Sequence, residues 1–149
     1  MAQRSVMDLL RERAEDKLND ATLQLGKVRQ TYEKARAELT QLQCYQQEYQ
    51  QELVARKQGK GLAVTHLLSY QFFINSLNQV VEQCSVRVAS CEDSVTQALS
   101  DWKNDSRRLN AFTTLKCRAD DIAKLNESRQ EQKLMDEFAS QIFLRKKSA

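Results

Sequence analysis

Few residues of this chain could do metal, thiol or acid–base chemistry, and their spacing does not suit it. The 149 residues include one histidine, His66, and four cysteines, Cys44, Cys84, Cys91 and Cys117. No two cysteines form the C-x-x-C pair typical of a zinc site, and only one histidine could supplement them. In a reducing compartment we expect small buried hydrophobic thiols rather than a disulfide framework. The sequence therefore predicts no metal and no cofactor.

Two other patterns could bind phosphate or perform catalysis, and both are incomplete. The segment 59–61 contains a Gly-Lys pair but not the full G-x-x-x-x-G-K-[ST] phosphate loop. The carboxylates fall on solvated helical faces, where Lys or Arg three or four residues away are their expected partners. His66 has no identifiable nucleophile to activate. We therefore predict that the chain is not an enzyme and that it functions by binding.

Charge and hydropathy narrow the class of partner. Twenty-three Lys and Arg stand against 20 Asp and Glu, and the net charge of +3 is spread evenly along the chain. Nucleic-acid binding requires clustered positive charge, so we expect that the chain does not bind nucleic acid. No apolar run approaches the roughly 20 residues that cross a bilayer, and no signal-peptide core is visible. The sequence predicts a cytosolic protein without an integral membrane segment.

The element that dominates the first arm is a coiled-coil seam. Apolar residues follow alternating steps of three and four, a spacing that keeps one stripe facing a partner helix. They are Leu18, Ala21, Leu25, Val28, Tyr32, Ala35, Leu39 and Leu42. The stripe extends back to Met7 and forward to Leu53, and the chain has no proline. We predict one helix from about residue 5 to about residue 57, too long to be stable without a partner.

A turn at about 58–64 should end this helix, because Gly59 and Gly61 tolerate the positive φ of a tight reversal. Thr65 is the expected N-cap of a second helix over about 65–117. The apolar residues of this second helix form two stripes that are offset from each other. One runs through Tyr70, Phe73, Leu77, Val80 and Cys84, and the other begins at Val81 and continues to Phe112. An extra four-residue step of this kind is a stutter and predicts a local change of surface shape near residues 77–84.

Folding the chain about residue 60 places apolar residues opposite one another, for example Tyr49 near Tyr70 and Leu18 near Trp102. The predicted fold is all-α, a long antiparallel two-helix coiled-coil hairpin in one domain (1–149), monomeric in isolation. An overhang over 118–149 then has no internal partner, and is either disordered alone or docked on another molecule. A parallel dimer, with the glycines as a kink, is the structural alternative.

The region beside the turn is rich in aromatic residues: Tyr45, Tyr49, Tyr70, Phe72 and Phe73. These rings either fill the seam, or Tyr45 and Phe72 help to expose an apolar patch for a partner. In the overhang, the segment 126–138 is either a solvated helix or a docking helix. The basic residues 145–147 are either a charged tail or a contact for acidic lipids.

Several stretches that a heptad pattern does not require are similar to the FliJ family of flagellar export proteins. They are Leu-Gly-Lys-Val-Arg at 25–29, Tyr-Gln-Gln-Glu-Tyr at 45–49, Tyr-Gln-Phe-Phe-Ile-Asn-Ser-Leu at 70–77, Trp102 with Arg108 and Leu109, and Met-Asp-Glu-Phe-Ala at 135–139. The resemblance covers nearly the whole chain. It implies a hairpin similar to the central stalk subunit of rotary F-type ATPases, within the type III export apparatus at the inner face of the cell membrane.

The partners that the resemblance implies are a hexameric export ATPase, the cytoplasmic part of the membrane export-gate protein, and export chaperones. The family's gate-binding face carries over to Leu42, Tyr45, Tyr49, Phe73, Leu77, Val80 and Cys84. At two positions the chain departs from the pattern: Cys84 replaces a polar or imidazole side chain, and Glu38 replaces a glutamine.

A stalk that enters a sixfold ring could contact its subunits unequally and make them hydrolyse ATP in sequence. Our hypothesis assigns the ring contact to the end of the hairpin that carries both chain termini. The residues assigned to it are Arg13, Lys17, Arg129, Lys133, Asp136 and Phe138. A chaperone-like binding module, a purely structural coiled coil and the stalk of a virulence secretion system are the alternatives.

Overall fold

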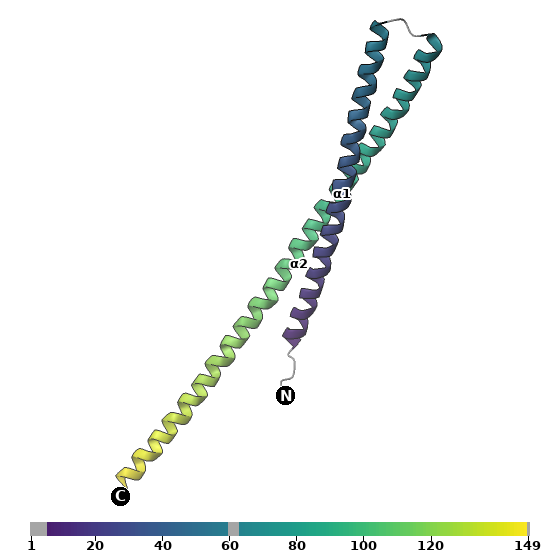
Figure 1. The fold of residues 1–149 in the computed structure, drawn as a ribbon. Coiled ribbons are helices and arrows are strands. Elements are labelled where there is room, and N and C mark those ends of the chain that lie inside the picture. The colour runs from purple at the N-terminus through teal and green to yellow at the C-terminus, as the bar shows by residue number, and fades with distance from the viewer. Residues whose placement is uncertain (1–5, 60–62, 149) are drawn as a thin grey trace. The chain divides into compact units, whose positions relative to one another are not determined.

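Two helices make up the fold. The structure is a computed structural model that describes residues 6–59 and 63–148. Within these ranges α1 runs from Val6 to Gln58 and α2 from Val64 to Lys147, with no strand (Figure 1). The two helices pack against each other, so the predicted all-α hairpin is confirmed.

Hydrogen bonds between the helices define their antiparallel order. Trp102 donates from Nε1 to Thr22 Oγ1 at 2.9 Å, joining residues 80 apart in sequence. Gln46 donates from Nε2 to Asn78 Oδ1 at 2.6 Å, joining residues only 32 apart. The separation in sequence therefore falls toward the turn, as it must when a chain folds back on itself.

The register differs from the predicted one by about one helical turn. Tyr49 contacts Phe73 rather than the expected Tyr70, and Trp102 bonds to Thr22, one turn beyond the expected Leu18. The prediction placed the fold point at residue 60, whereas the break between the helices is centred slightly later, between Gln58 and Val64. Each residue shift of the fold point moves every opposing pair by two residues, which accounts for about half of the difference.

The seam predicted for the first helix is confirmed residue by residue. Every member of the stripe from Met7 to Leu53 is buried or half-buried, while nearly all residues between them are exposed. Ala14, Leu25 and Ala35 are the most buried, at 4% to 7% exposure. A two-helix seam shields one stripe only, which explains why small and medium side chains occupy its most buried positions.

The seam of α2 corrects the predicted stutter. Ile74 is buried, whereas Phe73 and Val80 are both nearly half exposed. With Ile74 in the stripe, the less exposed residues follow alternating steps of three and four from Leu67 through Val81 to Phe112. The prediction was wrong because the larger Phe73 was chosen over its neighbour, which forced an artificial four-residue step.

The turn lies where the glycines predicted it, but its details differ. Gly59 follows the last residue of α1 and donates its backbone N–H to the Ala55 carbonyl at 3.1 Å. No described residue has a positive φ, so Gly59 does not use that freedom, and Gly61 lies outside the described residues. Thr65 is inside α2 rather than its N-cap, because Ala63 accepts the helical bond from Leu67.

The chain divides into two compact units. The central unit comprises Asn19–Asn104, and the terminal unit comprises the described residues of 1–18 and 105–149. In the terminal unit α2 continues without a break to Lys147, so the overhang is helical, and from Cys117 to Ser148 every residue is exposed. The interpretation of the whole chain as one domain stays a prediction.

Candidate functional site

Seven residues beside the turn form what we call the aromatic face: Leu42, Tyr45, Tyr49, Phe73, Leu77, Val80 and Cys84. All belong to the central unit. On each helix they follow one another at steps of three or four, so each set shares one side of its helix. The ring centroids of Tyr49 and Phe73 are 4.9 Å apart at an edge-on angle of 73°, which joins the two sets. The hydrogen bond of Gln46 with Asn78 lies toward the other side of the seam.

The aromatic face has a half-buried base and an exposed surface. Tyr49 and Leu77 are half-buried in the seam, whereas Tyr45, Phe73 and Val80 are 42%, 47% and 44% exposed. The Tyr45 hydroxyl accepts a hydrogen bond from Gln41 Nε2 at 3.1 Å, which holds its ring along α1. Tyr49 therefore lies in the seam, as one interpretation of the aromatic cluster expected, and Tyr45 is exposed, as the other expected. That a partner covers the exposed rings stays a prediction.

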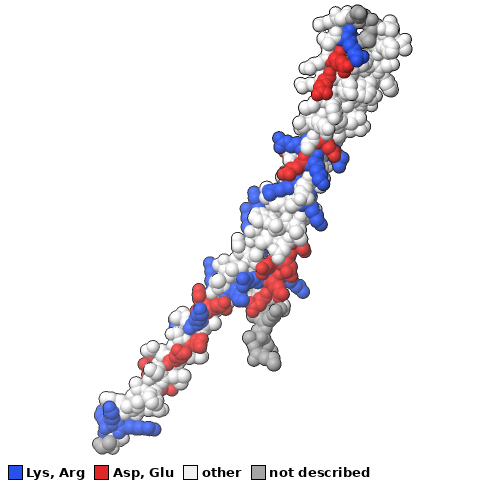
Figure 2. Space-filling model, viewed as in Figure 1, with Lys and Arg blue, Asp and Glu red and all other residues white. Residues whose placement is uncertain are grey.

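The part of α2 that contributes to the aromatic face carries almost no charge. Between Val64 and Val81 α2 has no Asp, Glu, Lys or Arg. Figure 2 shows the result as an uncharged expanse over this part of the two helices. A partner covering this surface would have few charges to desolvate, and exposed aromatic side chains are the residues that most often dominate binding energy.

A small polar cluster lies between the aromatic face and the turn. The Arg56 guanidinium lies 5.3 Å from the centre of the Tyr70 ring and 2.8 Å from the Glu52 carboxylate. Partial burial, followed by the hydrogen bond and charge of Glu52, raises the pKa of the Tyr70 hydroxyl above its usual value. Tyr70 was predicted in the seam without its two partners, although Glu52 and Arg56 have the i, i+4 spacing of a helical ion pair.

The opposite border of the aromatic face holds the two departures from the family pattern. The Glu38 carboxylate lies 3.9 Å from the Arg87 guanidinium, with both side chains largely exposed. Such a pair contributes little stability, but it provides a local counter-charge for the carboxylate. Cys84 is half-buried in the seam, where a thiol packs as a small apolar side chain.

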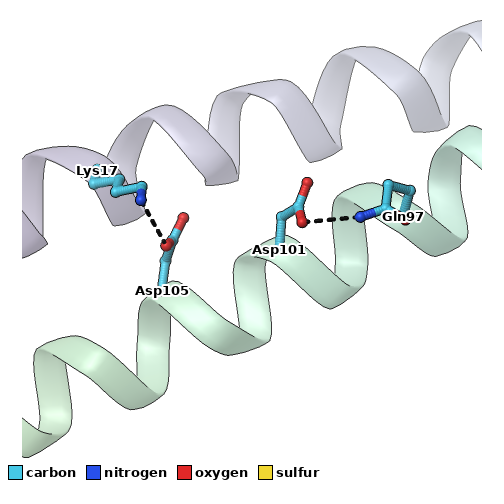
Figure 3. A network of polar contacts seen from close by, with 4 residues as sticks. All are labelled: Lys17, Gln97, Asp101 and Asp105. Atoms are coloured by element: carbon cyan, nitrogen blue, oxygen red, sulfur yellow. Dashed lines mark hydrogen bonds and ion pairs between the residues drawn. The ribbon is translucent and has the colours of Figure 1, made fainter.

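The residues assigned to the ATPase contact do not form one cluster. Lys17 Nζ lies 3.8 Å from Asp105 Oδ1, as Figure 3 shows, and Arg13 is exposed on the same helix. Arg129 follows Asp105 by 24 residues of continuous helix, so the two lie about 36 Å apart along the axis at roughly 1.5 Å per residue. Lys17 and Arg129 would therefore meet a partner at different levels.

Within the overhang, the four assigned residues lie on two sides of α2. Arg129, Lys133 and Asp136 are separated by four and three residues, which places them on one side of the helix. Phe138 is nine residues from Arg129 and so points the opposite way, with 64% of its surface exposed. It lies on the same side as Leu134, which is also exposed.

The cysteines fit the predicted role only in part. Cys84 and Cys91 are half-buried seam residues, but Cys44 and Cys117 are exposed, so the expectation of four buried thiols was wrong. All four are free thiols. Cys44 follows the seam residue Leu42 by two positions, which turns its side chain away from α2.

The described residues contain neither a metal-binding cluster nor a membrane-spanning stretch. No group of three or more His, Cys, Asp or Glu side chains among them could hold a metal ion. Within residues 6–59 and 63–148, neither helix contains an apolar stretch long enough to pass through a bilayer.

Comparison with known proteins gives a consistent result over nearly the full length. A family model described as "Flagellar FliJ protein" matches residues 3–148. A protein of that name from Salmonella typhi is 36% identical over 146 residues, covering 98% of this chain and 99% of the relative. Its namesake from Escherichia coli K12 is 33% identical over the same length, with the same coverage.

Proposed function

This chain belongs to the FliJ family of flagellar proteins, and we propose that it is a non-enzymatic component of the flagellar type III export apparatus. In this role it promotes assembly and activity of the hexameric export ATPase, couples that ring to the membrane export gate, and escorts export chaperones. The two relatives carry a flagellar name. That name favours the flagellar apparatus over a virulence secretion system.

The observation that carries the proposal is the aromatic face. It combines exposed Tyr45, Phe73 and Val80 with a stretch of α2, from Val64 to Val81, that has no Asp, Glu, Lys or Arg, and both helices contribute to it. Surfaces of this kind mark protein contacts, because burying aromatic side chains releases much free energy at little desolvation cost. We assign it to the cytoplasmic part of the export-gate protein.

The ATPase contact is assigned to the terminal unit. Blue and red charges intersperse along its part of α2 (Figure 2). Arg13 and Lys17 add exposed positive charge on α1. The assigned residues lie at different heights along the helix axis. An ATPase ring would therefore contact them at more than one height of its central channel. Membrane association follows from the gate contact rather than from insertion into lipid.

The test is calorimetric titration of the full chain with the cytoplasmic part of the cognate export-gate protein. Phe73→Ser should weaken binding by about 30-fold or more, the loss expected when a central aromatic contact is removed. Leu68→Ser is the matched control, since Leu68 is 60% exposed and lies about 140° round the helix from Phe73. Equal affinity of both variants and the parent chain would refute the assignment of this face.

A separate assay tests the ATPase half of the proposal. Adding the chain to the cognate export ATPase should raise hexamer assembly and ATP hydrolysis. An ATPase whose assembly and rate do not change with the chain present would refute the stalk-like role.

A further inference from the structure

The seam of the terminal unit differs in chemistry from that of the central unit. Its half-buried and buried stripe positions are Met7, Arg11, Ala14 and Leu18 on α1, and Asp105, Leu109, Phe112 and Lys116 on α2. Three of these carry a formal charge. No stripe position of the central unit does, although Gln46 is polar.

One of the three charged seam residues, Arg11, is incompletely satisfied. Asp8 and Lys116 form an ion pair, and Lys17 reaches Asp105, whose side chain is only 13% exposed. The Nε atom of Arg11 is buried and has no hydrogen-bond partner. A buried donor without a partner loses its hydration without compensation, so its burial opposes pairing of the two helices.

Apolar burial offers little to offset this cost. Among the described residues of the terminal unit only Ala14 is buried, and its methyl group contributes a small transfer energy. A surface groove lined by charged residues borders the seam of the terminal unit and leaves this part of the seam open to solvent. Its lining residues are Asp8, Arg11, Glu12, Glu15 and Lys116.

We propose that residues 6–18 of α1 detach from α2 as a local opening under native conditions, while the central unit stays paired. Local opening begins where buried apolar contacts are few. In residues 6–18 the described buried residue is Ala14, and the buried Nε of Arg11 adds an unpaired donor. The opening uncovers Leu109 and Phe112, which are half-buried when the segment is paired.

The experiment is native-state hydrogen exchange of the full chain, read by mass spectrometry. Backbone amides of residues 7–17 should exchange at least about tenfold faster than those of 25–42. Arg11→Leu replaces the unpartnered donor with an apolar seam residue and should slow exchange of 7–17 by about tenfold, leaving 25–42 unchanged.

Arg13→Leu is the matched control. Arg13 is exposed, and Arg and Leu have similar helix propensities, so this variant should leave exchange of 7–17 within about twofold of the parent chain. Equal protection of 7–17 and 25–42 in the parent chain would overturn the proposal. So would an Arg11→Leu variant whose amides exchange at the parental rate or faster.

Discussion

Truncation of a single seam leucine tests whether the stripe read from the sequence holds the hairpin together. Leu25 is 7% exposed, and Leu23, two residues earlier on the same helix, is 66% exposed. Burying a leucine side chain contributes about 1.5 to 3 kcal/mol, and Leu→Ala in a core costs about 2 to 5 kcal/mol once the residual cavity is included. A seam one stripe wide can collapse or admit water, so Leu25→Ala should lower the free energy of unfolding by about 2 to 3 kcal/mol.

The assay is urea unfolding followed by helical circular dichroism, with Leu23→Ala as the control. Alanine is a slightly better helix former than leucine, so the control should change the free energy of unfolding by no more than about 0.5 kcal/mol. If the two variants lose equal stability, the Leu25 stripe is not the interface, and the reasoning that links seam periodicity to pairing fails.

Three further predictions address the corrected seam, the tyrosine near the turn and the ATPase contact. Ile74→Ala should destabilise the chain in urea more than Phe73→Ala, because Ile74 is 8% exposed and Phe73 is 47% exposed. Burial and Glu52 raise the pKa of Tyr70, so its neutral form favours the folded state. Its contribution to stability is complete below the ordinary tyrosine pKa near 10 and is lost as pH rises through the higher folded value, a loss that Tyr70→Phe should remove. Arg13→Glu should reduce stimulation of the export ATPase, and is a cleaner test than reversal of Lys17, which would also repel Asp105.

Each of these has an outcome that counts against it. A Phe73→Ala variant less stable than Ile74→Ala would indicate that Phe73, and not Ile74, belongs to the seam, as the predicted stutter requires. An ultraviolet titration in which all four tyrosines ionise together at the ordinary pKa would contradict a raised pKa at Tyr70. Full ATPase stimulation by Arg13→Glu would place the ring contact elsewhere.

The sequence predicts the first seam well because periodicity alone determines which side of a long helix is buried. Each stripe residue from Met7 to Leu53 has the expected burial. The second seam was harder to read because Phe73 and Ile74 are adjacent and both apolar. Only the requirement for unbroken alternating steps of three and four favours Ile74, whereas the larger side chain favours Phe73.

Register and turn geometry depend on features that periodicity does not contain. A shift of the fold point by one residue moves every pair, and nothing in the glycine pattern specifies that residue. For the aromatic face, the spacing indicated that Tyr45 leaves the seam but wrongly kept Phe73 in it. The contact of Arg56 with Tyr70 depends on the register across the two helices. The unsatisfied Arg11 donor likewise follows from three-dimensional packing rather than from sequence.

The central claim is that one chain folds back on itself, so that both of its arms build the aromatic face. Spin labels at positions 38 and 87, in a background with the four native cysteines replaced by alanine, test it by dipolar distance measurement. The side chains of Glu38 and Arg87 approach to 3.9 Å, whereas a continuous helix would separate these positions by about 70 Å. We predict a short distance that persists when the labelled chain is diluted with excess unlabelled chain. A short distance that disappears on dilution, or one near the length of a continuous helix, would contradict the claim.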